Sequence, residues 1–243
     1  MKIGIQLCTL RSVIEEDLLG NFKRLSKMGF QGVELAGFYQ LSASKLKSLL
    51  DQASLEVFST HEGMNRLTND IESVIRDYKI LGTKQIIIPN ANLHDEKSYQ
   101  EILPEIKKIV KRLTDEGFTV HYHNHSHEFV SFNGKYILDH LLEDIKELKL
   151  ELDVYWARNA NVDELKFIEK HQGRIHFIHA KDMKIEKGAP LFESVGSGII
   201  DFKKIYQLTS EYWIVENDKP IGDPFVSIQK SIDYIKELKE SKL

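Results

Sequence analysis

Carboxylate and imidazole side chains recur in this sequence at the ends of short apolar runs. Asp153, His179 and Glu216 each close a run rich in Leu, Ile, Val or Phe. A carboxylate buried there without a partner would be costly, so these residues are expected at the mouth of a site. Two carboxylates and one imidazole suit Mn²⁺, Mg²⁺, Co²⁺ or Zn²⁺ as ligands. The three residues therefore predict a site for one divalent metal ion, if the fold brings their segments together.

The densest group of such residues lies between positions 121 and 128. Its sequence is HYHNHSHE, which contains four histidines and one glutamate. A solvated polar loop has little need for four histidines, so metal ligation or substrate binding is favoured. Alternation along a strand would place His121, His123 and His125 on one face. This segment is expected to supply a fourth metal ligand, which is either Glu128 or His123.

Short apolar strands alternating with amphipathic helices would position these residues. The expected strands cover 3–7, 32–35, 56–60, 85–89, 119–123, 149–154, 175–180 and 213–216. Uninterrupted apolar stretches within them are typical of strands buried on both faces, as parallel sheets require. Apolar residues recur at intervals of three and four over 18–28, 71–81 and 102–113, which predicts helices. Helices are expected to end at Gly29, Gly82 and Gly117.

Eight strand–helix units allow either a closed barrel or an open doubly wound sheet. The first strand is not followed by a glycine-rich dinucleotide fingerprint, which an open sheet of this kind would often carry. Polar residues close nearly every strand, where barrel enzymes build their sites. The 243 residues also match the roughly 250 of one α/β barrel, with no linker or shift in composition. The sequence therefore predicts one (β/α)8 TIM-barrel domain over residues 1–243.

Further polar side chains close the other strands and are expected to contact a substrate. Glu34 is either a second base or hydroxyl acceptor, or the partner of a salt bridge inside the barrel mouth. His61 is expected to bind a hydroxyl group or to carry a proton. Trp156 and Tyr39 would either offer apolar faces to a sugar ring or belong to the core. The predicted substrate-binding residues are Gln6, Glu34, His61, His123, His125 and Trp156.

Cys8 and the glycine-containing segment 193–198 are weaker indications of a functional role. Cys8 is expected to be a small buried apolar residue rather than a nucleophile. The segment 193–198, ESVGSG, would either bind a phosphate through its backbone N–H groups or form a surface turn. The turn would lead to a helix that begins near Asp201.

Composition and charge narrow the classes of partner. The net charge is -4, so the chain lacks the basic excess that binding to a nucleic acid needs. No apolar run is long enough for a membrane span, and no signal peptide is recognised at the N-terminus. One cysteine excludes an intrachain disulfide framework and suits a reduced compartment. We therefore expect a cytoplasmic protein that binds neither nucleic acid nor membrane.

Several of these segments together resemble one known family. They are GIQLCTLR at 4–11, YHNHSHEF at 122–129, ELDVYW at 151–156, HAKDM at 179–183, VGSGIIDF at 195–202 and IVEND at 214–218. In this combination they are similar to the sugar phosphate isomerase/epimerase family of xylose isomerase-like barrels. They also resemble the inosose dehydratases of that group. The similarity extends over essentially the whole chain.

The resemblance implies one divalent metal ion held by a carboxylate, an aspartate, a histidine and a final glutamate. The last three match Asp153, His179 and Glu216. Many relatives have Glu at the position of His123, so the first ligand is expected to be Glu128 from the following loop. His123 remains the rival ligand or a catalytic partner.

The resemblance also implies removal of a proton beside a carbonyl group. Family members isomerise ketoses, epimerise one carbon, or eliminate water from keto-inositols and keto-sugars. A metal would stabilise the enediolate, and Glu216 and Glu128 would exchange the proton on either side of the substrate. Lys181 would stabilise the oxyanion or help to expel a hydroxyl group. The prediction is a metal-dependent isomerase or epimerase of a sugar, keto-sugar or sugar phosphate, with a dehydratase as the alternative.

Two other classes share this superfamily or scaffold. Abasic-site endonucleases need several zinc ions and a basic groove, which the negative net charge disfavours. A non-catalytic sugar-binding protein would keep the barrel without turnover. The expected partner is a small carbohydrate, and association into a homo-oligomer is left open.

Overall fold

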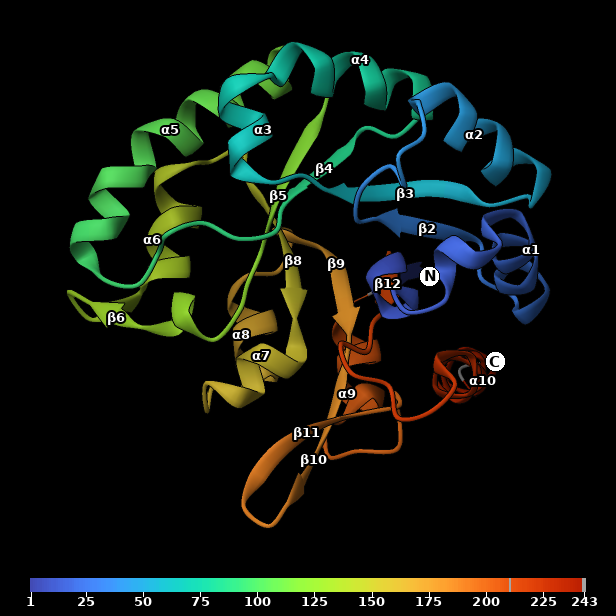
Figure 1. Cartoon of the computed structure of the whole chain (residues 1–243). Helices are drawn as coiled ribbons and strands as arrows, with labels where there is room; N and C mark the ends of the chain where they lie inside the picture. Colours follow the sequence, from blue (N-terminus) through green and yellow to red (C-terminus); the bar gives the residue numbers. More distant parts are fainter. Residues whose placement is uncertain (210, 242–243) are drawn as a thin grey trace.

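The computed structural model describes residues 1–209 and 211–241 as a closed barrel of eight parallel strands (Figure 1). Around the barrel the order is β1-β12-β9-β8-β5-β4-β3-β2, so neighbours in the ring follow one another along the chain. The strands are β1 (Lys2–Gln6), β2 (Gly32–Leu35), β3 (Glu56–His61), β4 (Gln85–Ile88), β5 (Thr119–His123), β8 (Lys149–Asp153), β9 (Ile175–Ala180) and β12 (Tyr212–Val215). The predicted barrel is confirmed, and each expected strand lies within one residue of the observed one.

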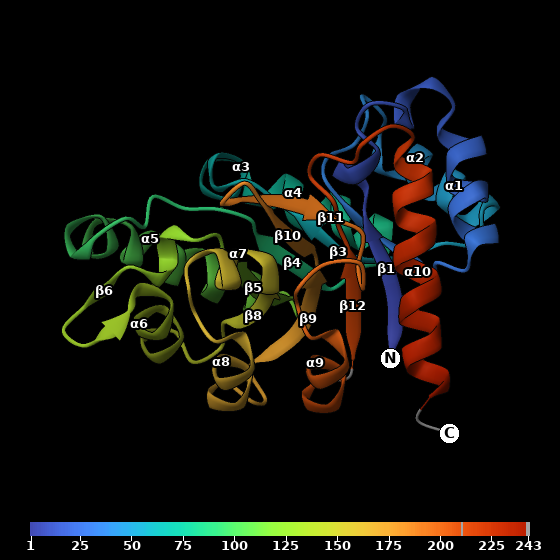
Figure 2. The same ribbon diagram turned by 90° about the horizontal axis from the view of Figure 1, so that it is seen from below.

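Helices surround the barrel (Figure 2). They are α1 (Leu18–Met28), α2 (Ala43–Gln52), α3 (Met64–Asn69), α4 (Ile71–Leu81), α5 (Glu96–Asp115), α6 (Ile137–Asp144), α7 (Val154–Asn159), α8 (Glu164–Lys170), α9 (Phe202–Leu208) and α10 (Pro224–Glu240). Helix α1 shows why these segments are helical. Asp17 accepts a hydrogen bond from Gly20 N at its start, an apolar face packs on the barrel, and Gly29 ends it with φ 102°. Within the described residues, no helix is both long enough and apolar enough to cross a membrane.

Two antiparallel hairpins were not expected from the sequence. Strands β10 (Asp182–Glu186) and β11 (Ala189–Glu193) extend from the end of β9 and project away from the barrel (Figure 1). Their turn uses Lys187 and Gly188, both at positive φ, as a tight hairpin requires. Strands β6 (Ser131–Phe132) and β7 (Lys135–Tyr136) form the second, shorter hairpin.

Three apolar side chains pack together in the lower part of the barrel interior and are called its floor here. Phe58, Phe177 and Ile214 form one buried cluster separate from the main core. Phe58 fits because Gly32 has no side chain: a Cβ there would lie 2.6 Å from ring atoms of Phe58 and 2.8 Å from the carbonyl oxygen of Glu56. Because side chains alternate along a strand, the residues two positions after Phe177 and Ile214 point into the barrel above this floor.

The close packing of Phe58 against Gly32 predicts the effect of Gly32→Ala. The new methyl group should overpack against Phe58 and reduce the free energy of unfolding by about 1–3 kcal/mol. Urea denaturation of the single and double variants would measure this. In a Phe58→Leu background, Gly32→Ala should reduce the free energy of unfolding by clearly less. If the losses of the two single variants simply add in the double variant, the proposed clash is contradicted.

Candidate active site at the barrel mouth

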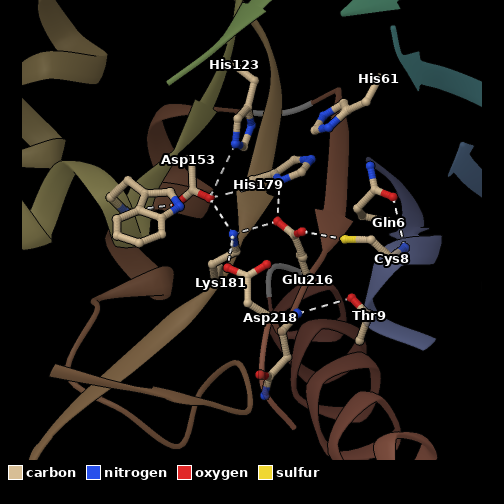
Figure 3. Close-up of polar contacts among 12 residues, drawn as sticks. Gln6, Cys8, Thr9, His61, His123, Asp153, His179, Lys181, Glu216 and Asp218 are labelled. Carbon is tan, nitrogen blue, oxygen red and sulfur yellow. Dashed lines mark hydrogen bonds and ion pairs between the residues drawn. The ribbon is translucent and has the colours of Figure 1, made fainter. Parts of the chain in front are cut away.

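Three side chains from consecutive strands of the ring converge at the C-terminal end of the barrel (Figure 3). The ligand atoms of Asp153, His179 and Glu216 lie within 4.8 Å of one another, and all three residues are buried. His179 Nδ1 is 3.0 Å from Glu216 Oε2 and 4.0 Å from Asp153 Oδ2. His123 Nε2 also lies 4.0 Å from Asp153 Oδ2. The residues singled out at the strand ends are therefore together in space.

The ammonium group of Lys181 lies among these carboxylates. Its Nζ is 2.6 Å from Glu216 Oε2, 2.9 Å from Asp153 Oδ2 and 3.0 Å from Asp218 Oδ2. Burial by itself would lower the pKa of Lys181, but Asp153 and Glu216 outweigh it and hold that pKa well above its usual range. Lys181 is therefore a charged group fixed between two candidate metal ligands.

A second layer of charged groups lies directly below the mouth. Three imidazole nitrogens surround Glu151 Oε2: His61 Nε2 at 2.7 Å, and His123 Nδ1 and His179 Nε2 at 3.1 Å. Glu34 Oε1 is 2.7 Å from His179 Nε2 and 3.0 Å from His61 Nε2. Burial alone would lower the pKa of His61, but Glu34 and Glu151 outweigh it and raise that pKa to about 10.

The two layers orient the rings of His123 and His179. Each ring directs one nitrogen toward the upper carboxylates and the other toward a lower one. Paired carboxylates of this kind fix the orientation of metal-binding histidines in proteins. Asp153 Oδ2 is buried, and apart from the Lys181 ammonium at 2.9 Å it has no hydrogen-bond partner among the described residues. The donor set of Asp153, His179 and Glu216, with His123 nearest to it, therefore fits a divalent cation.

Glu128 does not join this group, although the sequence favoured it as the first metal ligand and as a catalytic residue. Its Oε1 accepts a hydrogen bond from Tyr122 Oη at 2.7 Å, and its Oε2 accepts one from His125 N at 2.8 Å. The chain turns away after β5 because Asn124 is hydrogen-bonded on both sides to the backbone of Asp153. Glu128 consequently belongs to a separate cluster with His125 and His127.

Gln6 and Glu34 are fully buried, and their polar atoms bond within the protein. Gln6 Nε2 donates to Glu34 Oε1 at 2.7 Å, and Ser59 Oγ donates to Glu34 Oε2 at 2.6 Å. This is the arrangement expected if Glu34 forms an ion pair inside the barrel rather than binding a sugar hydroxyl. The His61 side chain is 15% exposed and remains reachable from the mouth.

Trp156 follows Asp153 on the rim. Its backbone N donates to Asp153 Oδ1 at 2.9 Å, which begins helix α7. The half-buried indole lies 5.6 Å from the ring of His125, and Lys181 Nζ is 5.8 Å from it. Trp156 is thus placed where an apolar face could meet a substrate.

Sequence reasoning missed two members of the site. Glu151, at the centre of the lower layer, lies two residues before Asp153, so strand alternation was a signal that could have found it. Cys8 Sγ donates to Glu216 Oε1 at 2.8 Å. Burial, together with Glu216, raises the pKa of the Cys8 thiol, which keeps it protonated rather than nucleophilic. The thiol is thus a hydrogen-bond donor to Glu216 rather than an isolated apolar group.

The glycine-rich segment after β11 does not offer a free phosphate cradle. Gly196 N and Gly198 N both donate to Asp182 Oδ2 at 2.9 Å. Asp182 Oδ1 also accepts from Met183 N and Ile200 N, so four N–H groups bind one carboxylate. The alternative expectation was right, because the segment is a turn that leads to α9, capped by Asp201.

Known proteins resemble the chain over most of its length. Inosose dehydratase from Geobacillus thermodenitrificans (strain NG80-2) is 23% identical over 256 residues, covering 86% of this chain and 85% of the relative. A sugar phosphate isomerase/epimerase structure from Parabacteroides distasonis has a TM-score of 0.82 at 22% identity, covering 97% of this chain and 93% of the other. The structure of 3-keto-D-glucoside 4-epimerase from E. coli has a TM-score of 0.71 at 16% identity, covering 98% and 99%. At such identities the two structures establish the fold alone.

A family model covers nearly the whole barrel. Residues 22–237 match the model described as the xylose isomerase-like TIM barrel. The match begins after β1 and ends within α10, so it contains seven of the eight barrel strands and every candidate ligand at the mouth. This protein therefore belongs to the xylose isomerase-like TIM barrel family.

Proposed function

We propose that this protein is an enzyme that removes a proton from the carbon beside a carbonyl group of a small keto-sugar or keto-cyclitol. The observation that carries the proposal is the convergence of Asp153, His179 and Glu216 at the barrel mouth. The similarity to proteins named as inosose dehydratase supports a polyhydroxylated ketone as the substrate class. The proposal includes one divalent metal ion as cofactor.

Asp153, His179 and Glu216 would hold the ion, and His123 is the nearest further donor. A divalent ion bound there would stabilise negative charge that develops on substrate oxygen atoms. Mixed imidazole and carboxylate donors suit Mn²⁺, Co²⁺, Zn²⁺ or Mg²⁺. The lower layer of Glu34 and Glu151 would keep the imidazole rings in their binding orientation.

Glu216 is the residue proposed to take the proton. Burial by itself would raise the pKa of Glu216, but Lys181 and His179 outweigh it and hold that pKa well below its usual range. Glu216 is therefore an ionised carboxylate at the open end of the barrel, as a general base must be. The thiol of Cys8 and the ammonium of Lys181 fix both of its oxygens in place.

A dehydratase is the second candidate. It is favoured because the site offers one carboxylate base, Glu216, with the ammonium of Lys181 beside it. An epimerase that uses two bases needs a second carboxylate across the substrate, and Glu128 is fully buried and bonded elsewhere. Lys181 instead places an ammonium donor 2.6 Å from Glu216. In an elimination, Glu216 would take the proton and pass it to the departing hydroxyl group, so that water leaves, while Lys181 holds Glu216 in place.

Replacement of Lys181 by Met tests the charge balance of the mouth. Without the ammonium, Asp153 and Glu216 remain buried near each other, so the free energy of unfolding should fall by about 3–5 kcal/mol in chelator. Lys2→Met is the matched control, because the Lys2–Glu56 pair is exposed and should cost about 1 kcal/mol or less. Equal losses in the two variants, measured by chemical denaturation, would contradict this account.

Turnover of a keto-inositol, measured after removal of the metal and after replacement of Glu216, tests the proposed activity. Chelator should abolish turnover, and added Mn²⁺, Co²⁺ or Mg²⁺ should restore it. Glu216→Gln should lower kcat by on the order of 10²-fold or more with the fold preserved. The exposed Glu143→Gln, which affects only the surface pair with Lys135, serves as the control. Full turnover in metal-free protein, or in Glu216→Gln, would refute the proposal.

The products distinguish the two candidate reactions. Incubation with a keto-inositol or keto-sugar in D₂O, followed by NMR, should show deuterium at the carbon beside the carbonyl. Exchange with retention of every hydroxyl group indicates isomerisation or epimerisation. Loss of water, with an enone or dione visible by ultraviolet absorbance, indicates the dehydratase. Turnover without either change would exclude both reactions.

A further inference from the structure

Half of the histidine-rich segment lies outside the site at the barrel mouth. His123 faces into the barrel, but the chain then turns, and His125, His127 and Glu128 form a group of their own. This group lies where the short helix η3 (His127–Phe129) follows β5. None of its three members belongs to the group of Asp153, His179 and Glu216.

The ligand atoms of His125, His127 and Glu128 lie within 4.8 Å of one another. Two of their ring nitrogens, His125 Nδ1 and His127 Nε2, are buried and make no hydrogen bond among the described residues. His127 Nε2 lies 3.1 Å from Glu128 Oε1 without the geometry of a hydrogen bond. Buried polar atoms are nearly always paired, so His125 Nδ1 without a partner, next to a His127 Nε2 that has only the Glu128 carboxylate beside it, needs an explanation.

The surrounding structure holds the three groups in place. Glu128 is anchored by Tyr122 Oη and by the backbone N of His125, yet a carboxylate has about four acceptor positions and keeps some free. Ser126, between the two histidines, is fixed by hydrogen bonds to Trp156 O and from Asn159 Nδ2. The His127 side chain is 24% exposed, which gives an ion access from solvent.

We infer that His125, His127 and Glu128 form a second metal site, specific for a divalent transition-metal ion such as Zn²⁺. Two imidazoles and one carboxylate are a donor set used by zinc sites with an open position, whereas Mg²⁺ and Ca²⁺ prefer oxygen donors alone. The ion would pair both buried nitrogens and link the start of η3 to the end of β5. The site is independent of the ion proposed for the barrel mouth, because the two share no ligand.

Metal stoichiometry tests this inference without reference to activity. Full-length protein is stripped with chelator and then dialysed against micromolar Zn²⁺ or Co²⁺, and bound metal is counted by mass spectrometry. In an Asp153→Asn background, which disables the mouth site, one ion per chain should remain. His127→Ala or Glu128→Gln in that background should remove it, since loss of a ligand should weaken binding by more than the ~100-fold caused by loss of an outer partner.

His94→Ala is the matched control, because its exposed ring lies 4.6 Å from the ring of His127 but is not part of the group. This control should retain the ion. If Asp153→Asn impairs folding, the difference between wild type and His127→Ala gives the same count, with circular dichroism confirming the fold. Retention of the ion by folded His127→Ala, its loss in His94→Ala, or binding only at millimolar metal would each overturn the inference. Because Asp153→Asn removes only the mouth ion, the two sites are counted separately, and failure of one does not imply failure of the other.

Discussion

The interior of the upper barrel holds several carboxylates away from bulk water. Glu34, Glu151 and Glu216 are buried there with Asp153, and imidazole rings and one ammonium group lie beside them. Unpaired, each carboxylate would be strongly destabilising. The requirement for compensation therefore determines which side chains can occupy the barrel mouth. It also explains why His179, placed between both layers, touches acidic residues from three other strands.

Strand geometry is what allows this arrangement. Residues two positions apart point into the barrel at successive heights, so β8 contributes Glu151 to the lower layer and Asp153 to the upper one. The same alternation places Phe177 in the floor and His179 above it. One short strand thus supplies both a supporting residue and a candidate ligand. Chemistry at the mouth consequently depends on register within each strand more than on the loops between them.

The sequence predicts the barrel well because periodicity and strand-end polarity are local signals. Asp153, His179 and Glu216 were recognisable for that reason, whereas the partners of Gln6 and Glu34 depend on contacts between neighbouring strands that no local pattern records. Glu128 was misplaced because the turn after β5 is set by Asn124, whose partner lies on another strand. The hairpin of β10 and β11 was missed, although Lys187-Gly188 is a recognisable turn. Single-domain organisation remains an expectation.

The apolar floor formed by Phe58, Phe177 and Ile214 limits where protons can reach the site. Aromatic and aliphatic groups offer neither protons nor hydrogen-bond relays, so these three side chains pass no protons to the charged groups above them. A ligand bound at the open end of the barrel would therefore lie on the side from which those charged groups can exchange hydrogen with the solvent.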